Sequence, residues 1–158
     1  MKILKYKILF FYFFILVPFE CFSKFALVSS NSFSHLLVEV AKTNNQKIKG
    51  LMFVKKLRTN GLLLLYDKPK VVNIWMKNTE IPLDIIFINN KKIISSIREG
   101  KPFSEKTISS KVPIIGVLEI PKDCVKKLNL NQGDRADWVF INNEEKKNIR
   151  YYHCLDDF

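Results

Sequence analysis

The stretch that decides the fold is residues 73–88, which read NIWMKNTEIPLDIIFI. A polar string that contains a tryptophan and a lysine separates two apolar, β-branched runs, and Pro82 follows it. Such runs on either side of turn residues are typical of paired strands. The pattern predicts strands at residues 71–78 and 83–88, with Glu80 and Ile81 as the tight connection between them.

This connection sets a register, because opposite residues then have numbers that sum to 161. Lys77 is expected to face Asp84, and Trp75 to face Ile86. The register would place a lysine, a carboxylate and an indole ring in one small neighbourhood. An Ile-Pro bond at Pro82 is compatible with either the trans or the cis form.

Two interpretations of this hairpin stay open. In the first it forms a ligand site, with Trp75 as an apolar wall and Lys77, Asn78, Thr79 and Asp84 as polar anchors. In the second it is structural, because an exposed Lys-Asp pair contributes only about 0 to 1 kcal/mol and Asn-Thr is a common turn sequence.

The rest of the chain indicates an α+β protein with a β-rich single domain, in which a curled or barrel-like, mostly antiparallel sheet carries two short helices. Further strands are expected at residues 36–40, 61–66, 93–97, 114–120 and 136–141, and helices at residues 44–53 and 121–130. Residues 99–113 indicate an irregular loop that could form a lid or pocket rim.

The first residues resemble a secretory signal peptide. Lysines precede an apolar run at residues 8–19, and Cys21 and Ser23 are the small residues before a cleavage site. We therefore expect a signal peptide at residues 1–23, a domain at 24–141, a C-terminal extension at 142–158, and a periplasmic or extracellular protein with no transmembrane helix in the mature chain. The alternatives are an uncleaved N-terminal membrane anchor and, third, lipoprotein processing at Cys21.

Cleavage would leave two cysteines, Cys124 and Cys154. In an oxidising compartment they could form a disulfide. The alternative, two unpaired thiols of which one is a small core residue, stays open because the sequence does not show whether the chain returns.

The chain is basic, with a formal net charge of +11. Removal of residues 1–23, which carry three lysines and one glutamate, lowers it to +9. Lysine supplies 22 of the 26 basic residues, in scattered pairs without stacking aromatics between them. This pattern favours a solvated surface over a nucleic-acid patch.

Signatures of chemistry are scarce in the sequence. It contains no paired-cysteine metal motif, no histidine pair at helical spacing, no GxSxG and no glycine-rich phosphate loop. We therefore predict no metal and no cofactor. The expected partner is an unknown small molecule or a component of the cell envelope.

Several motifs together resemble the uncharacterised bacterial and archaeal family known as domain of unknown function 192. They are KGLMF at residues 49–53, WMKNT and IPLD in the opening stretch, VLEIP at residues 117–121 and QGDR at residues 132–135. The matching positions are Gly50, Leu51, Met52, Trp75, Met76, Lys77, Asn78, Thr79, Ile81, Pro82, Leu83, Asp84, Glu119, Gly133 and Asp134. The resemblance covers about residues 36–141 and implies a compact β-rich domain, without implying an activity.

The chain departs from the family pattern at Val54, where an arginine is common, and at Leu62, where a methionine is common. It also lacks the usual proline pair after Ile97. We expect a binding or accessory module of the cell envelope. The alternative is an enzyme in which Lys77 and Asp84 transfer protons.

Overall fold

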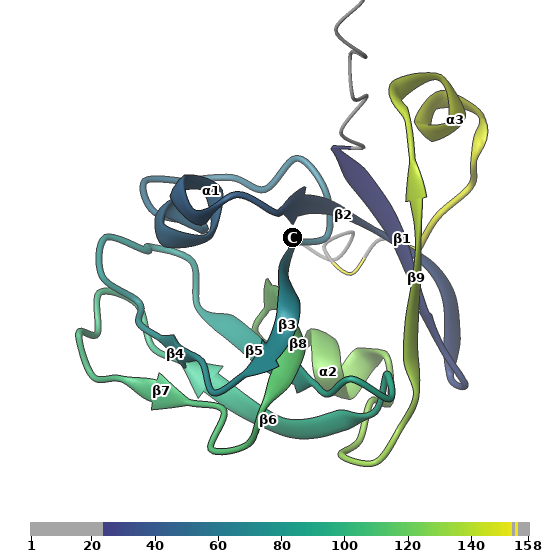
Figure 1. Cartoon of the computed structure of the whole chain (residues 1–158). Coiled ribbons are helices and arrows are strands. Elements are labelled where there is room, and N and C mark those ends of the chain that lie inside the picture. Colours follow the sequence, from purple (N-terminus) through teal and green to yellow (C-terminus); the bar gives the residue numbers. More distant parts are fainter. Residues whose placement is uncertain (1–23, 153, 155–158) are drawn as a thin grey trace, which may run out of the picture.

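The computed structural model describes residues 24–152 and residue 154, so the expected signal peptide lies outside the described residues. The long sheet contains β1 (Phe25–Ser30), β2 (Phe33–Ala41), β3 (Leu62–Lys70), β5 (Leu83–Ile88), β6 (Ile94–Gly100), β8 (Ile114–Pro121) and β9 (Ala136–Ile141). Its strand order is β6-β5-β8-β3-β2-β1-β9. The short strands β4 (Asn73–Ile74) and β7 (Ile108–Ser109) form a separate pair (Figure 1).

The long sheet curls until its two edge strands approach each other. Strands β2 and β3 are parallel and the other neighbours are antiparallel. Beyond the starts of β6 and β9, Ile93 forms a bridge with Arg135, and the Ile94 amide donates to the Asp134 carbonyl at 2.9 Å. The prediction of a β-rich α+β domain with a curled, mostly antiparallel sheet is confirmed.

The described residues contain three short helices, one more than we predicted: α1 (Asn44–Lys49), α2 (Cys124–Lys127) and α3 (Asn143–Asn148). Thr43 and Gln46 begin α1 with a capping box, and α1 ends at Gly50, whose φ is +47°. The helix is therefore shorter than residues 44–53. No helix in the described part of the chain has the length and apolar content to cross a membrane.

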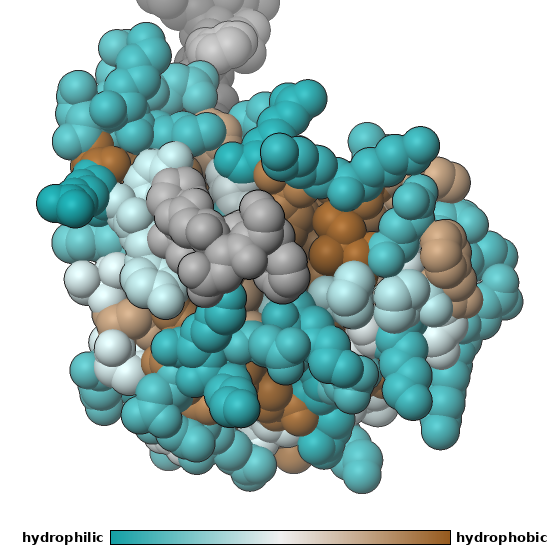
Figure 2. Space-filling view, turned by 180° about the vertical axis from the view of Figure 1, so that it is seen from behind, coloured by the Kyte–Doolittle hydropathy of each residue, from teal (hydrophilic) through white to brown (hydrophobic). Residues whose placement is uncertain are grey.

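Apolar side chains of the curled sheet separate into two main clusters, one on each face. Along β5, Leu83, Ile85 and Phe87 join one cluster, whereas Ile86 and Ile88 join the other. This alternation follows from the two-residue period of a strand. Burying one such side chain stabilises the fold by about 1.5 to 3 kcal/mol. On the outside, hydrophilic side chains cover most of the face seen from behind, with smaller hydrophobic areas between them (Figure 2).

The C-terminal segment is attached to the sheet by a disulfide and by a buried amide. Cys124 and Cys154 form a disulfide, with 5.8 Å between their Cα atoms. The sequence had left open whether these two cysteines pair or remain free thiols. The fully buried Asn60 accepts from the Cys154 amide at 2.7 Å and donates to the carbonyls of Leu37 and Tyr152. The segment after β9 therefore packs against the domain.

The predicted hairpin between residues 71–78 and 83–88 does not form. Only two residues of its first half are in a strand, β4, and β4 pairs with β7 instead of β5. The Met76 amide donates to the Ser104 carbonyl, and the Phe103 amide donates to the Thr79 carbonyl. Asn78 has a φ of +54°, which turns the chain away from an extended path. The segment after β4 thus pairs with the loop that follows β6, and the peptide before Pro82 is trans.

Candidate functional site

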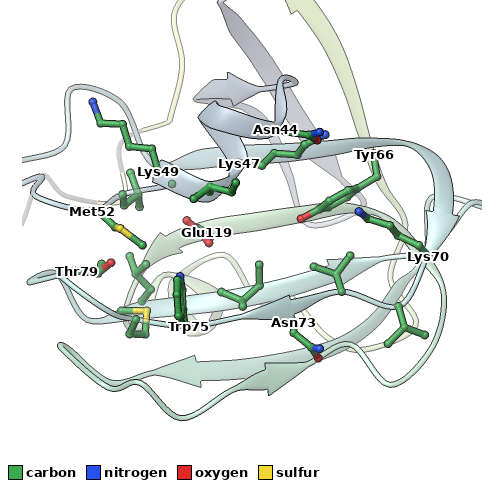
Figure 3. A pocket seen from close by; sticks show the side chains of 18 residues that line it. Asn44, Lys47, Lys49, Met52, Tyr66, Lys70, Asn73, Trp75, Thr79 and Glu119 are labelled. Carbon is green, nitrogen blue, oxygen red and sulfur yellow. The ribbon is translucent and has the colours of Figure 1, made fainter.

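A cavity of about 500 Å³ opens between α1, β3, β4 and the end of β8. Its volume lies within the range of small-molecule sites, about 300 to 1,000 Å³. The lining residues are Asn44, Lys47, Ile48, Lys49, Gly50, Leu51, Met52, Tyr66, Lys70, Val71, Val72, Asn73, Ile74, Trp75, Met76, Thr79, Leu83 and Glu119. We call this cavity the Glu119 pocket (Figure 3).

Glu119 is the buried acid of the pocket. Its residue surface is 5% exposed, and its carboxyl group has no hydrogen-bond or ion-pair partner among the residues that the structure describes. Burial raises the pKa of Glu119 from its ordinary value of 4.5 to about 7. The carboxyl oxygens are not among the fully enclosed side-chain atoms without a partner, so they remain accessible from the cavity.

The sheet determines why this carboxyl group faces the pocket. Within β8, Glu119 lies opposite Ile85 of β5 and Leu62 of β3, both of which belong to the apolar cluster on the pocket side. The helix end leaves room above it, because a Cβ added at Gly50 would be 3.8 Å from the Oε2 atom of Glu119. The turn at Gly50 therefore brings the backbone after α1 close to the acid.

Two lysines surround Tyr66 at one end of the pocket. The Nζ atom of Lys47 donates to the Leu65 carbonyl at 3.0 Å and lies 4.9 Å from the centre of the Tyr66 ring. The Nζ atom of Lys70 lies 4.8 Å from the same centre. Burial first, and the charge of Glu119 second, raise the pKa of Tyr66 to about 12. Tyr66 therefore stays protonated at neutral pH, with its hydroxyl group directed into the pocket (Figure 3).

Trp75 provides the largest apolar wall. Its residue surface is 47% exposed although it stands inside the ring of lining residues, between the buried Ile74 and Met76 (Figure 3). Thr79 lines the pocket as well and is 4% exposed. An indole surface that remains accessible in a cavity can take up the flat or apolar part of a ligand.

The structure separates the residues that the sequence placed in one site. Trp75 and Thr79 line the Glu119 pocket, whereas Lys77, Asn78 and Asp84 do not. The Nζ atom of Lys77 lies 5.6 Å from the Trp75 ring centre and 3.6 Å from a carboxylate oxygen of Glu105, in an exposed pair. Lys77 is thus near the rim, on the outside.

The predicted pairing of Lys77 with Asp84, and of Trp75 with Ile86, is wrong. In the sheet, Asp84 lies opposite Glu99 and Ile120. The physical reason is the turn at Asn78, whose carbonyl oxygen accepts from the Phe53 amide at 2.8 Å. That bond holds the WMKNT segment against the KGLMF segment and away from β5.

Asp84 has a structural partner on the other face of the sheet. Its Oδ2 atom accepts from the Val125 amide in the first turn of α2 at 3.0 Å. Burial raises the pKa of Asp84, and the bond from Val125 opposes this rise. Asp123, which precedes the helix, makes no side-chain capping bond, so Asp84 takes the place of a cap.

Sequence reasoning missed the polar residues that occupy the pocket: Glu119, Tyr66, Lys47 and Lys70. One signal was present, because Glu119 is a charged residue inside the apolar strand sequence IIGVLEIP. A charged residue in an otherwise buried strand is either paired or functional. Within the described residues, no cluster of three or more histidine, cysteine, aspartate or glutamate side chains could hold a metal ion.

The motifs that carried the family resemblance meet at this pocket. Gly50, Leu51, Met52, Trp75, Met76, Thr79, Leu83 and Glu119 are all lining residues. They come from three motifs far apart in the sequence, KGLMF, the WMKNT to IPLD stretch and VLEIP. The fold therefore converts three separate sequence signals into one concave surface.

Comparisons with known proteins agree with this grouping. The family model DUF192, described as uncharacterized ACR, matches residues 26–138. No curated protein matches the chain.

Two solved structures are similar to the chain. One, from Sinorhizobium meliloti 1021 and described as a proposed transcription regulator, is 34% identical, has a TM-score of 0.67, and is aligned over 72% of this chain and 92% of its own. Another, a protein of unknown function from Novosphingobium aromaticivorans DSM 12444, is 30% identical, has a TM-score of 0.65, and is aligned over 72% of this chain and 84% of its own. The chain belongs to the DUF192 family.

Proposed function

We propose that the protein is an exported module that binds a small molecule in the Glu119 pocket and serves the cell envelope. The observation that carries the binding proposal is Glu119, a residue that is 5% exposed and whose carboxyl group faces a cavity of about 500 Å³ without a partner among the described residues. Leaving such a group unsatisfied costs about 1 to 3 kcal/mol, which a ligand with a hydrogen-bond donor would recover.

The shape and lining of the pocket support the same proposal. Trp75, Met76 and Leu83 supply apolar surface, while Tyr66, Thr79 and Glu119 supply a few convergent polar groups. Small-molecule sites in proteins combine these two features. The pocket also lies between elements distant in the sequence, so its geometry depends on the whole fold.

Export is supported by the disulfide between Cys124 and Cys154. Such bonds persist in oxidising compartments and are rare in the cytosol. The test is fractionation of cells that express the full chain, followed by N-terminal sequencing. A mature protein that starts near Lys24 outside the cytoplasm is the expected result, and an uncleaved cytoplasmic protein would reject export.

Ligand binding is tested by a thermal-shift screen of the protein recovered from cells that express the full chain. Suitable compounds are cell-wall fragments, sugars, amino acids, short peptides and nucleotides. Trp75→Ala and Glu119→Gln are each expected to weaken a genuine ligand at least tenfold. Asp84→Asn is the matched control, because Asp84 lies on the other face and asparagine retains an acceptor for the Val125 amide. Stabilisation that survives both pocket substitutions would reject the pocket as the site.

A second candidate function is acid-base catalysis by Glu119. The observation in its favour is the pKa of Glu119 near 7, which suits proton transfer at neutral pH. It requires that a compound bound in the pocket be chemically altered, with a rate that Glu119→Gln abolishes. A compound recovered unchanged after prolonged incubation identifies the protein as a binding module only.

A further inference from the structure

The Glu119 pocket has two ends of opposite charge that do not neutralise each other. Glu119 comes from β8, whereas Lys47 and Lys70 come from α1 and β3. Among the described residues, neither lysine forms an ion pair with Glu119. Both ammonium groups instead lie within 5 Å of the Tyr66 ring, Lys47 at 4.9 Å and Lys70 at 4.8 Å.

The lysines also differ from Glu119 in their exposure to water. Lys70 is exposed at the end of β3 and Lys47 is half-buried, while Glu119 is buried. The burial of Glu119 outweighs any attraction to these cations, since desolvation alone accounts for the raised pKa of Glu119. The positive groups thus belong to the mouth of the pocket and the acid to its interior.

Apolar side chains also line the pocket. Trp75 stands beside Glu119 in the close-up view, and Ile74 and Met76 flank it in the chain (Figure 3). Lys49, although it lines the pocket, extends away from its centre (Figure 3). The pocket therefore offers a buried acid, an exposed indole surface, and two cations at the Tyr66 end.

We infer that the ligand is a small zwitterion, with an ammonium group against Glu119, an apolar body against Trp75, and a carboxylate or phosphate group facing Lys47 and Lys70. This inference rests on the proposed binding function and specifies its ligand class. A free amino acid or a dipeptide has this distribution of groups, and so does an aminoalkyl phosphate.

Ligands with one charge satisfy only half of this arrangement. An anion would meet the lysines but leave the buried carboxyl group of Glu119 without a donor. A cation would pair with Glu119 but would leave Lys47 and Lys70 without an anionic partner. A zwitterion forms a desolvated ion pair with Glu119 and a solvent-screened ion pair with Lys47 and Lys70. Both of its charges therefore contribute to the affinity.

The test uses four forms of one compound that carry both charges, one charge or none: L-phenylalanine, its N-acetyl derivative, its methyl ester, and N-acetyl-phenylalanine methyl ester. O-phosphoethanolamine and leucyl-leucine extend the series to a phosphate and to a dipeptide. Because the chain has two tryptophans, Trp75 and Trp138, a Trp138→Phe variant reports on the pocket through Trp75 fluorescence alone. We expect removal of either charge to weaken binding at least tenfold.

Two substitutions assign each charge to its partner. Glu119→Gln should abolish the preference for a free ammonium group and keep the preference for a free carboxylate. Lys70→Met should do the reverse. Lys68→Met is the matched control, because Lys68 lies on the same strand, carries the same charge and does not line the pocket. Urea unfolding of each variant verifies that it is folded.

The outcomes separate this inference from the proposed function. If the neutral N-acetyl-phenylalanine methyl ester or another uncharged compound binds in the pocket as tightly as any zwitterion, the zwitterion inference is overturned and the binding function stands. If none of the zwitterions binds while another compound changes the Trp75 fluorescence, the zwitterion inference is also overturned and the binding function also stands. If no compound of any class perturbs Trp75, both proposals fail.

Discussion

Asp84 and Glu119 are two carboxyl groups on neighbouring strands, and their surroundings differ. Asp84 on β5 lies opposite Ile120, while Glu119 on β8 lies opposite Ile85. The alternation of side chains sends them to opposite faces of one sheet. Asp84 accepts a hydrogen bond from the Val125 amide and supports α2. Glu119 has no partner in the described chain and faces a cavity.

This difference shows how to distinguish a structural acid from a functional one. Both groups have a pKa raised by burial, so the pKa alone does not separate them. The presence of a protein donor separates the two acids. A carboxylate with a donor stabilises the fold, whereas a buried carboxylate without one lowers the stability. The group without a protein donor is therefore the one that we propose binds a ligand.

The largest expected effect concerns the backbone that holds Glu119 in place. A Cβ added at Gly61 would collide with the carbonyl oxygen of Glu119. Backbone atoms cannot move aside as a flexible side chain can, so Gly61→Ala should lower the free energy of unfolding by at least about 3 kcal/mol. Urea denaturation measures this value.

Gly133→Ala is the control for that substitution. Gly133 also has a positive φ, +96°, but a Cβ there would meet no atom within 4 Å. It should cost only about 1 kcal/mol, from backbone strain. If both variants lose the same free energy of unfolding, the close approach of Gly61 to the Glu119 backbone is not important for stability. If Gly61→Ala cannot be recovered as a folded protein while Gly133→Ala can, this result also shows that Gly61→Ala loses more stability.

The second effect is the pH dependence that Glu119 imposes. Its pKa is 4.5 when unperturbed and about 7 in the fold, so between these values the folded state binds the extra proton. Its contribution to stability is fully present below pH 4.5 and is lost as the pH rises to about 7, a change of about 3 kcal/mol. Tyr66, the other titratable group of the pocket with a shifted pKa, stays protonated over this range because its pKa is raised to about 12.

Glu119→Gln removes this titration and serves as the measurement. The stability of the variant relative to the unaltered protein should rise by about 3 kcal/mol between pH 4.5 and pH 8 in urea unfolding experiments. Taking the difference between the two proteins cancels the titration of Asp84 and of surface groups. A difference that stays constant with pH would mean that the carboxyl group of Glu119 is hydrated, and it would remove the main contrast with Asp84.

The smallest effect tests the structural role of Asp84. Asp84→Ala leaves the Val125 amide without its acceptor and should cost about 1 to 2 kcal/mol, as the loss of a helix cap does. Glu99→Ala is the control, because Glu99 lies opposite Asp84 in the sheet but pairs with Lys122 on the surface, and it should lower the stability less than Asp84→Ala does. A loss of ligand affinity in Asp84→Ala, with stability unchanged, would reverse the roles assigned to the two acids.

Local pattern was sufficient for the strands with strong apolar character. The β-branched run of β8 and the run of β9 were predicted within one residue of their observed bounds. Strand β1 was not predicted, because its six residues, FALVSS, follow directly on the expected signal peptide and end in two serines. It forms a strand because it pairs with β2 on one side and with β9 on the other, and β9 is distant in the sequence.

The candidate site was predictable in part. Trp75 and Thr79 were selected from the opening stretch and line the pocket, but their polar companions were sought among near neighbours in the sequence. Glu119 lies 31 residues beyond the end of the stretch at Ile88, and Lys47 and Tyr66 come before the stretch. The turn at Asn78 then separated Lys77 from β5, through a backbone bond to Phe53 that sequence periodicity does not reveal. Asp84 is outside the pocket because the alternation of side chains along β5 turns it to the other face of the sheet.

The sequence by itself determined the β-rich class, most of the strands and the family, because these depend on side-chain alternation and on short motifs that are local along the chain. The tertiary structure alone decided that Cys124 meets Cys154, that Asp84 supports α2, and that Glu119 is left unpaired in a cavity. The physical reason is that a buried carboxyl group acquires its role from the donors around it. Strand pairing between distant parts of the chain decides whether such a donor lies next to the carboxyl group.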